Sequence, residues 1–316
     1  MNLLELPFLT RLRRAQRILI SGAGGGFDVF AGLPLYFALR NLEKEVVLSN
    51  LSFTYLGGTN AEFLTPALAK VTALTQGETH YFPERYLCQW FASRGEAPSM
   101  YCFEKVGVAP LREAYAHIVA KHAIDAIVLV DGGTDILMRG DEAGLGTPEE
   151  DMTSLAAVAG LQVPHRIVTC LGFGIDAFHG VCHAQFLENV AALDTVGGYL
   201  GAHTLLLGMP EAQLFRDALD FVHARMPERP SIVNTSILSA LEGHFGDHHR
   251  TRRTRTSKLF INPLMALYWH FDLQAVAERS LYLPSLEGTQ TVFEVSAFIE
   301  AFRRGVVLRP RSNIPV

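Results

Sequence analysis

Apolar runs of the β type alternate with helical patterns along the first part of the chain, and this alternation constrains the fold most. Buried strands are predicted over 17–21, 45–53, 100–105, 123–130 and 165–171. Helices are predicted between them, over 28–42, 61–74, 84–92, 110–122 and from 148 onward. Strands that alternate with helices are typical of parallel sheets with right-handed crossovers. We therefore predict a three-layer, mainly parallel, Rossmann-like α/β fold with helices on both faces of the sheet.

Beyond residue 180 the pattern becomes mostly helical. Helices are predicted over 183–193, 210–225, 232–242 and 263–279, with one short strand at 258–262. No repeat or low-complexity linker interrupts the chain, and 49% hydrophobic residues in 316 suit a large core. We predict one α/β domain over 1–316, in which a helix-rich half from about 201 completes a glycine-loop half that ends near 200.

Composition and net charge limit the kinds of partner that this chain can bind. A net charge of −5 gives no global attraction to nucleic acid or to an anionic membrane, and no apolar run is long enough to span a bilayer. The four cysteines form no C-x-x-C pair, which favours reduced, buried thiols in a cytoplasmic protein. Segment 1–16 lacks the features of a signal peptide and predicts a short amphipathic helix packed on the body. A homo-oligomer is plausible on general frequency alone.

Three of the predicted strands end in glycine-bearing loops that carry acid. The loops are 22–28 (GAGGGFD), 131–135 (DGGTD) and 172–176 (GFGID). Each loop by itself could be a tight turn whose aspartate caps a helix. Parallel strands bring their carboxyl ends to one edge of a sheet, where ligands of open α/β folds bind. The three loops together therefore predict a site.

We expect this site to draw residues from all three loops and from a basic segment near 250. The candidate catalytic residues are Asp131, Asp135, Asp176, His179 and His183. The candidate ligand-binding residues are Gly22, Gly24, Gly25, Gly26, Asp28, Gly132, Gly133, Thr134, Gly174, Arg250 and Arg253. If a metal binds, Asp131 and Asp135 are the expected ligands, because they adjoin the strand end.

The first loop does not match the known phosphate-binding patterns. The third glycine of a dinucleotide fingerprint would fall on Phe27, and Ser49 and Asn50 stand where a ribose-binding acid is expected. A P-loop is excluded because no Gly-Lys-Ser/Thr follows. Asp28 would repel a phosphate from the helix that it begins, so a helix cap or a contact to a hydroxyl group or cation is favoured. The amides of 24–26 could still cradle an anion upstream.

Two further acidic residues follow the second loop. Asp141 and Glu142 follow Asp131 and Asp135, with Arg139 between the pairs. Clustered carboxylates share a proton or take up a divalent cation, although the spacing is not that of an EF-hand and a solvated acidic loop is the alternative.

A helix start follows this acidic stretch. Thr147 and Pro148 open the helix, and Glu150 completes a capping box with Thr147. Since this local role accounts for them, Glu149 and Asp151 rank low as catalytic candidates.

The histidines and the basic segment each allow two interpretations. His179 and His183 are four residues apart, which would place them on one helical face, but Gly180 stands where a zinc-protease signature needs Glu. One of them could serve as a general acid or base, or both could simply pack. Segment 242–258 is either an exposed loop or a lid whose arginines hold an anion; nucleic-acid binding ranks last.

Several long stretches carry a resemblance to a known family. They are LVDGGTDILMRGDE, GLGTPEEDM, CLGFGIDAFHGVCHAQFLENVAAL, PSIVNTSILSALEGHFGDHH and LFINPLMALYWHFDL. In this order they resemble the bacterial and archaeal family known as domain of unknown function 1152. The resemblance implies a single α/β domain and lends no activity. The chain departs from the family at Ile136, where we associate the motif with Ser.

Two functional hypotheses follow. The first is an enzyme, a hydrolase or group transferase, which acts on a small anionic molecule resembling a nucleotide or a sugar phosphate. The cofactor is unknown, with a divalent metal as one option. The alternative is a non-catalytic sensor that binds a nucleotide or metabolite in the same pocket.

Overall fold

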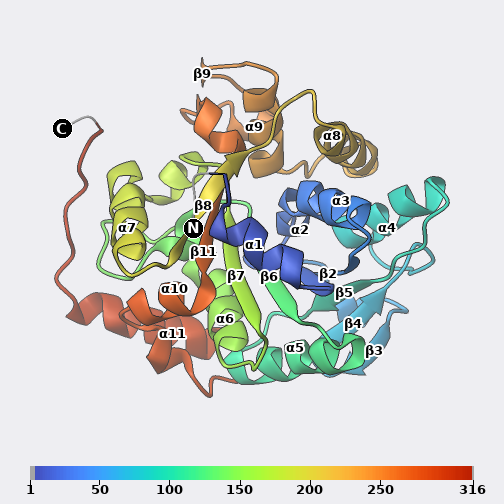
Figure 1. Cartoon of the computed structure of the whole chain (residues 1–316), viewed down its shortest axis with the longest axis horizontal. Coiled ribbons are helices and arrows are strands. Elements are labelled where there is room, and N and C mark those ends of the chain that lie inside the picture. Colours follow the sequence, from blue (N-terminus) through green and yellow to red (C-terminus); the bar gives the residue numbers. More distant parts are fainter. Residues whose placement is uncertain (1–3, 315–316) are drawn as a thin grey trace.

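The structure, a computed structural model, describes residues 4–314 and is built on a nine-stranded sheet (Figure 1). The strand order is β3-β4-β5-β2-β1-β6-β7-β11-β8. The strands are β1 (Arg17–Gly22), β2 (Glu45–Leu51), β3 (Glu62–Thr65), β4 (Leu68–Val71), β5 (Met100–Phe103), β6 (Ala126–Asp131), β7 (His165–Cys170), β8 (Tyr199–Thr204) and β11 (Leu267–Asp272). A separate two-stranded ladder joins β9 (Gly246–Asp247) to β10 (Phe260–Ile261).

The centre of the sheet is parallel and its flanks are antiparallel. Strands β5, β2, β1, β6 and β7 all run in the same direction. On one flank β4 pairs antiparallel with β5, and on the other β11 lies antiparallel between β7 and β8. The mainly parallel α/β fold is confirmed, and strands from the C-terminal part of the chain extend the same sheet.

Helices cover both faces of the sheet. They are α1 (Pro7–Arg14), α2 (Asp28–Ala31), α3 (Leu33–Asn41), α4 (Pro83–Ser93), α5 (Val108–His122), α6 (Pro148–Ala159), α7 (His183–Thr195), α8 (Pro210–His223), α9 (Ile232–Leu241), α10 (Leu273–Arg279) and α11 (Val292–Gly305). Side chains alternate along β1: Ile18 and Ile20 pack with α1 to α4, α8 and α9, whereas Leu19 packs with α5, α6, α7, α10 and α11. The three layers follow from this alternation.

Residues 61–74 form a hairpin of β3 and β4, so the helix predicted there is wrong. Pro66 lies in the turn between the two strands, and Ala69 of β4 pairs with Cys102 of β5. A short apolar run can enter a helix or a strand, and here the open edge of β5 supplies the hydrogen bonds that decide the outcome.

The helix predicted over 263–279 is also wrong in its first half. A short 3-10 turn at Pro263–Ala266 leads into β11, and α10 begins only after Asp272, whose carboxylate accepts a hydrogen bond from the Ala275 N–H at 3.0 Å. The aromatic residues of β11 favour a strand, and β7 and β8 offer partners on both sides. Strand β8 and helix α11 were not predicted.

Smaller differences concern helix ends. Gly32 divides the segment 28–42 into α2 and α3. The N-terminal helix packs on the body through Phe8 and Leu12, as predicted, and all four cysteines are buried and free. Among residues 4–314 no helix has the length and apolar character needed to cross a membrane.

Candidate functional site

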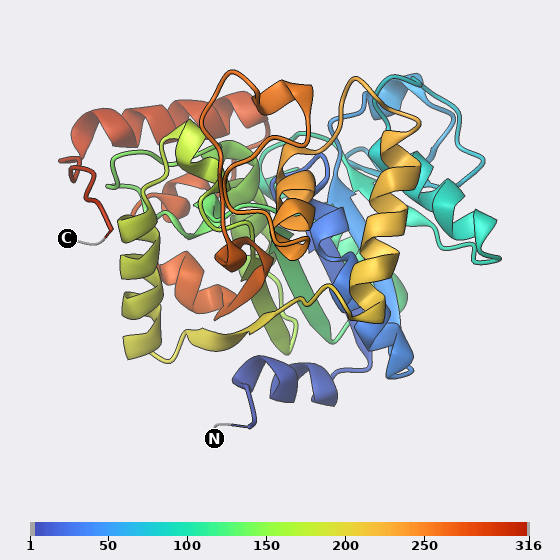
Figure 2. The same cartoon turned by 90° about the horizontal axis from the view of Figure 1, so that it is seen from above.

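The strand order reverses between β1 and β6. The chain passes from β1 to β2 and β5 on one side, and then returns to place β6 and β7 on the other side. The loops that follow β1 and β6 therefore flank the crevice where ligands of such sheets bind. Figure 2 shows α1 beyond one end of the strands, while α9 and the segment 242–258 (orange) lie at the other end.

The first glycine loop turns back on itself through Asp28. Gly25 and Gly26 have φ angles of 92° and 63°, a conformation that favours glycine. The Asp28 carboxylate accepts hydrogen bonds from the Gly24 N–H at 2.7 Å and from the Gly132 N–H at 3.3 Å. Asp28 thus joins the loop after β1 to the loop after β6, and it does not cap α2, whose N-cap is Phe27.

Three polar side chains from separate elements hold this loop in place. Asn50, at the end of β2, donates to the Gly26 carbonyl oxygen at 2.9 Å. Ser154 of α6 donates to the Ala23 carbonyl oxygen at 2.8 Å, and Asn234 of α9 donates to the Phe27 carbonyl oxygen at 3.1 Å. Asn50 therefore supports the loop from the position where a dinucleotide-binding protein would present its acid.

The second and third loops interlock through their aspartates. Asp131 accepts from the N–H groups of Gly133, at 2.6 Å, and Ile136, at 3.2 Å. Asp176, from the loop after β7, accepts from the N–H of Thr134 at 2.7 Å and from its hydroxyl at 3.3 Å. The contribution of position 136 is thus a backbone donor, which Ile supplies as well as Ser.

The Thr147 hydroxyl, which was expected to cap α6, donates its hydrogen bond to Asp135 instead. The Thr147 N–H and hydroxyl both donate to Asp135, at 2.7 and 3.1 Å. Thr147 is the N-cap residue, but its side chain accepts no hydrogen bond from the helix. The capping box with Glu150 is therefore wrong, and Glu150 pairs instead with Lys105 at 2.8 Å.

Asp151 belongs to the site, in contrast to its low rank as a catalytic candidate. One carboxylate oxygen from each of Asp28, Asp131 and Asp151 lies within 4.8 Å of the others. Asp151 stands in the first turn of α6, and its Oδ1 is buried without a hydrogen-bond partner. The low rank of Asp151 is corrected, because the crossover from β6 to β7 brings the start of α6 back to the end of β1.

Burial is the largest influence on the pKa values of the five aspartates at this edge, which are Asp28, Asp131, Asp135, Asp151 and Asp176. It raises the pKa of Asp28 to about 7, where hydrogen bonds from Gly24 and other amides oppose the rise. Burial, followed by the charge of Asp135, raises the pKa values of Asp131 and Asp176 well above their usual range. The pKa of Asp151 is raised in the same way, by burial and then by Asp131. In residues 4–314 no lysine or arginine forms an ion pair with any of the five.

The two histidines do not share a helical face, so that prediction is wrong. His179 ends a 3-10 helix (Ile175–His179), Gly180 stops it with a φ of 95°, and His183 begins α7. The charge of His179 acts to lower the pKa of Asp135, whose net pKa is raised by burial, so this histidine lies within electrostatic reach of the cluster. Burial lowers the pKa of His183, and its Nε2 is buried without a partner.

The two candidate arginines have different surroundings. Arg250 forms an ion pair with Glu242 at 2.5 Å, which ties it to the end of α9. Arg253 donates to the Pro230 carbonyl oxygen at 2.8 Å, next to the N-cap of α9, and is otherwise exposed. Its charge acts to lower the pKa of Tyr81, although burial raises that pKa overall. The Tyr81 hydroxyl would lie 2.9 Å from a Cβ at Gly26, so Arg253 stands on the glycine-loop side.

Phe53 and Lys105 complete the rim and were missed. The Phe53 ring covers Gly25 and Gly26, and it leaves too little room for a Cβ at Gly25. The Lys105 ammonium lies 3.9 Å from the centroid of that ring. Each residue is the second one after a strand of the parallel core, β2 or β5, so the rule that singled out the glycine loops could also have found them.

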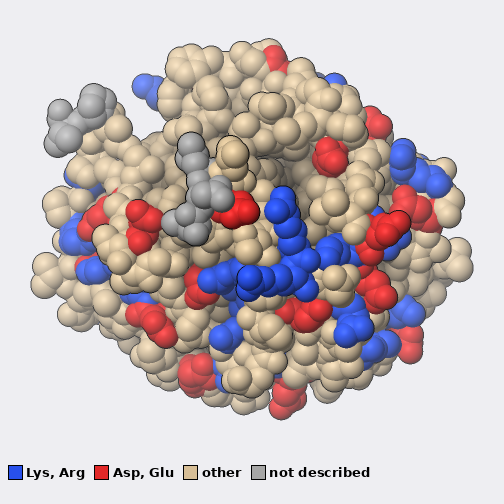
Figure 3. Space-filling model, in the orientation of Figure 1, with Lys and Arg blue, Asp and Glu red and all other residues tan. Residues whose placement is uncertain are grey.

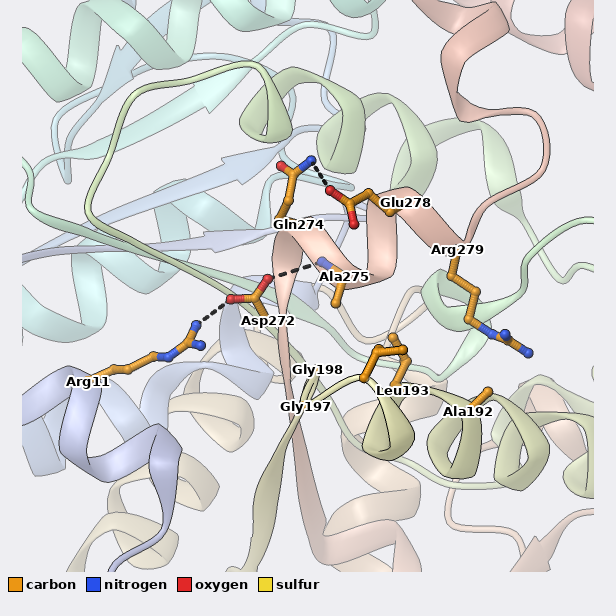
Figure 4. Close-up of a pocket in the computed structure, with 11 residues that line it drawn as sticks. Arg11, Ala192, Leu193, Gly197, Gly198, Asp272, Gln274, Ala275, Glu278 and Arg279 are labelled. Carbon is orange, nitrogen blue, oxygen red and sulfur yellow. Dashed lines mark hydrogen bonds and ion pairs between the residues drawn. The ribbon is translucent and has the colours of Figure 1, made fainter. Parts of the chain in front are cut away.

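A cavity lies at the opposite edge of the sheet (Figure 4). It has a volume of about 550 Å³, and its polar lining is occupied by structural bonds. Arg11 of α1 pairs with Asp272 at 2.6 Å, and Gln274 donates to Glu278 at 3.0 Å. Figure 3 shows Lys and Arg side chains gathered on the same face, around the last turn of α1. None of the predicted site residues lines this cavity.

Comparison with known proteins assigns a family. A family model described as Protein of unknown function (DUF1152) matches residues 60–304. The chain belongs to this family. The match contains Asp131, Asp151 and Asp176, and it begins after the first glycine loop. No curated protein and no solved structure matches the chain.

Proposed function

We propose that the protein is an enzyme, a hydrolase or group transferase, that acts on a small anionic molecule at the carboxyl edge of the sheet. The substrate would resemble a nucleotide or a sugar phosphate. The observation that carries this proposal is the convergence of five aspartates, four of them buried and Asp28 half-buried, at the point where the strand order reverses.

Four buried carboxyl groups and a fifth that is half-buried destabilise a fold unless they are well partnered. Burying an uncharged hydrogen-bonding group without a partner costs roughly 1–3 kcal/mol. Burying an unpaired charge costs more. Such arrangements occur mainly where a site uses them, and perturbed carboxyl groups in a crevice are typical of acid–base and metal chemistry. The shared edge and the mutual repulsion of these groups support a functional interpretation over a purely structural one.

The backbone amides of the loops are poorly available to an anion. The N–H groups of Gly24, Gly132, Gly133 and Thr134 donate to aspartates, and that of Gly26 donates to the Leu51 carbonyl oxygen. Binding an anion therefore needs positive charge from elsewhere. Arg253, beside the start of α9, is the candidate side chain for this role.

A hydrolytic step would use the aspartates around the crevice. Asp135 and Asp176 each accept, through one carboxylate oxygen, hydrogen bonds from a threonine. As a general base, one of them would take a proton from water while the water oxygen bonds to the phosphorus or carbon centre of the substrate. The leaving oxygen would receive a proton from a protonated carboxyl or from His179. A group transfer differs only in that an acceptor hydroxyl replaces the water.

A paired binding and turnover screen tests the proposal. Nucleotides and sugar phosphates, each with and without Mg²⁺ or Mn²⁺, are screened for a rise in melting temperature and for product formation. We expect at least one compound to do both, and Asp176→Asn to lower its turnover by about a hundredfold or more. Asp194→Asn, an exposed position on α7, is the matched control and should keep full activity.

Two outcomes count against the enzyme. Binding without any turnover would assign the site to a sensor that recognises a metabolite. A substrate whose turnover survives both Asp131→Asn and Asp176→Asn would place the chemistry elsewhere in the molecule.

A further inference from the structure

We propose that Asp28, Asp131 and Asp151 bind one divalent cation, of the Mg²⁺ or Mn²⁺ class, at the reversal point of the sheet. This inference deepens the proposed function, since the ion would let an anionic substrate approach five carboxylates. It involves a different set of ligands from the pair that the sequence suggested, Asp131 and Asp135.

The distances suit a hard cation with oxygen ligands. One oxygen from each of the three carboxylates lies within 4.8 Å of the others. Ligands at ~2.1 Å around an octahedral Mg²⁺ are separated by about 3 to 4 Å, so a small contraction of the cluster would complete the arrangement. No histidine or cysteine belongs to the trio, which disfavours zinc.

Asp151 provides independent evidence for a ligand. Its Oδ1 is buried and has no hydrogen-bond partner, whereas both oxygens of Asp28 and both oxygens of Asp131 accept N–H groups. The residue is only 2% exposed. A buried carboxylate oxygen without a donor is destabilising unless a cation or a proton satisfies it.

Gly24 keeps the space between two of these carboxylates open. A Cβ at this position would lie 2.8 Å from Asp151 Oδ1 and 3.0 Å from Asp28 Oδ2. The φ angle of Gly24 is not positive, so its backbone conformation does not require glycine. The absence of a side chain there is therefore explained by the approach of the two carboxylates.

The surrounding amides orient the ligands. Asp28 is held by Gly24 and Gly132, and Asp131 by Gly133 and Ile136, so four backbone N–H groups fix two of the three carboxylates. Such outer contacts set the direction of metal ligands in known sites. Asp151 is fixed by its place in the first turn of α6.

The test measures metal binding directly and does not depend on turnover. The full chain is freed of metal with a chelator, and Mn²⁺ binding is followed by electron paramagnetic resonance and by calorimetry. We expect one Mn²⁺ per chain, competition by Mg²⁺, and a rise in melting temperature with either ion. Asp151→Asn should weaken Mn²⁺ binding by at least about tenfold.

A second readout keeps the test decisive. Asp151→Asn replaces a buried carboxyl group, which its acidic neighbours disfavour, with a neutral amide of the same shape. In chelator this variant should therefore melt at or above the temperature of the wild type, which separates lost binding from lost folding. Asp194→Asn is the control and should bind Mn²⁺ like the wild type. The inference is overturned if the wild type binds no Mn²⁺, or if Asp151→Asn binds it unchanged.

The two proposals fail in different ways. Turnover without a bound ion would overturn the metal site and leave the enzyme standing. Stoichiometric Mn²⁺ binding with no turnover in the substrate screen would overturn the enzyme and leave the metal site standing.

Discussion

The acidic side chains at the two edges of the central sheet differ in their partners. At the amino edge, Asp125 accepts hydrogen bonds from the N–H groups of Gln16 and Arg17, and Asp272 pairs with Arg11 while it caps α10. At the carboxyl edge, four buried aspartates and the half-buried Asp28 lie together, and no lysine or arginine in the described part of the chain forms an ion pair with any of them.

The difference separates structural acids from candidate functional ones. The amino-edge carboxylates each satisfy a local need, such as a helix N-terminus or a neighbouring cation, and contribute modestly to stability. The carboxyl-edge carboxylates repel one another; backbone N–H groups hold four of them, whereas Asp151 Oδ1 is buried without a partner. Sites that break local rules in this way are where function is expected.

The largest effect is expected at Gly24. In Gly24→Ala, the new Cβ would meet the carboxylates of Asp151 and Asp28, at 2.8 and 3.0 Å. We expect Mn²⁺ binding and any turnover to fall by more than about tenfold, with a loss of roughly 1–3 kcal/mol in the free energy of unfolding. Gly208→Ala is the control, because a Cβ there meets no atom within 4 Å. Equal binding in the two variants would contradict the crowding of carboxylates around Gly24.

An intermediate effect is expected at Glu84, a buried acid beneath the first glycine loop. Burial raises the pKa of Glu84 from 4.5 to about 7, although the Asn50 amide partly opposes the rise. Because the folded state holds the proton more tightly, the stability of the wild type is fully present below pH 4.5 and falls as the pH rises through 7. Glu84→Gln keeps the acceptor for Asn50, at 2.9 Å in the wild type, and removes the titration.

The measurement compares unfolding free energies of Glu84→Gln and the wild type by urea denaturation. We expect near equality at about pH 5 and an advantage of roughly 1–3 kcal/mol for the variant at about pH 8. Glu113→Gln, at an exposed position on α5, should show no such trend. A difference that does not change with pH would mean that the Glu84 carboxyl is not held protonated in the folded state.

The smallest effect is expected at the amino edge. Arg11→Ala breaks a half-buried ion pair with Asp272 and should cost no more than about 1 kcal/mol. Asp272→Ala should cost more, by about another 1 kcal/mol, because it also removes the cap of α10. Thermal or urea unfolding checks both values, and neither variant should alter Mn²⁺ binding. A change in Mn²⁺ binding in either variant would show that the two edges are coupled.

Much of the parallel core was predictable because its strands are apolar runs, three of which lead into glycine loops. Segments 17–21, 123–130 and 165–171 became β1, β6 and β7 for this reason. Segments 61–74 and 263–279 failed because short apolar runs suit either a helix or a strand. The free edge of β5 and the gap between β7 and β8 decided those cases, and neither is visible in a local window.

The site followed the same division. Parallel strands with glycine and aspartate at their carboxyl ends were enough to predict that Asp28, Asp131 and Asp176 lie at one edge. Asp151 was missed because its place in the first turn of a helix was enough to explain an acid there. The contact of Thr147 with Asp135 was missed because its hydroxyl could equally have capped α6.

The sequence by itself determined the layered α/β architecture and the edge at which its acidic loops gather, since both follow from short-range periodicity and from chain direction. Only the tertiary structure decided which carboxylates meet. That choice depends on how α6 returns across the sheet and on which backbone N–H groups remain to hold each aspartate, and both are properties of contacts between segments far apart in the chain.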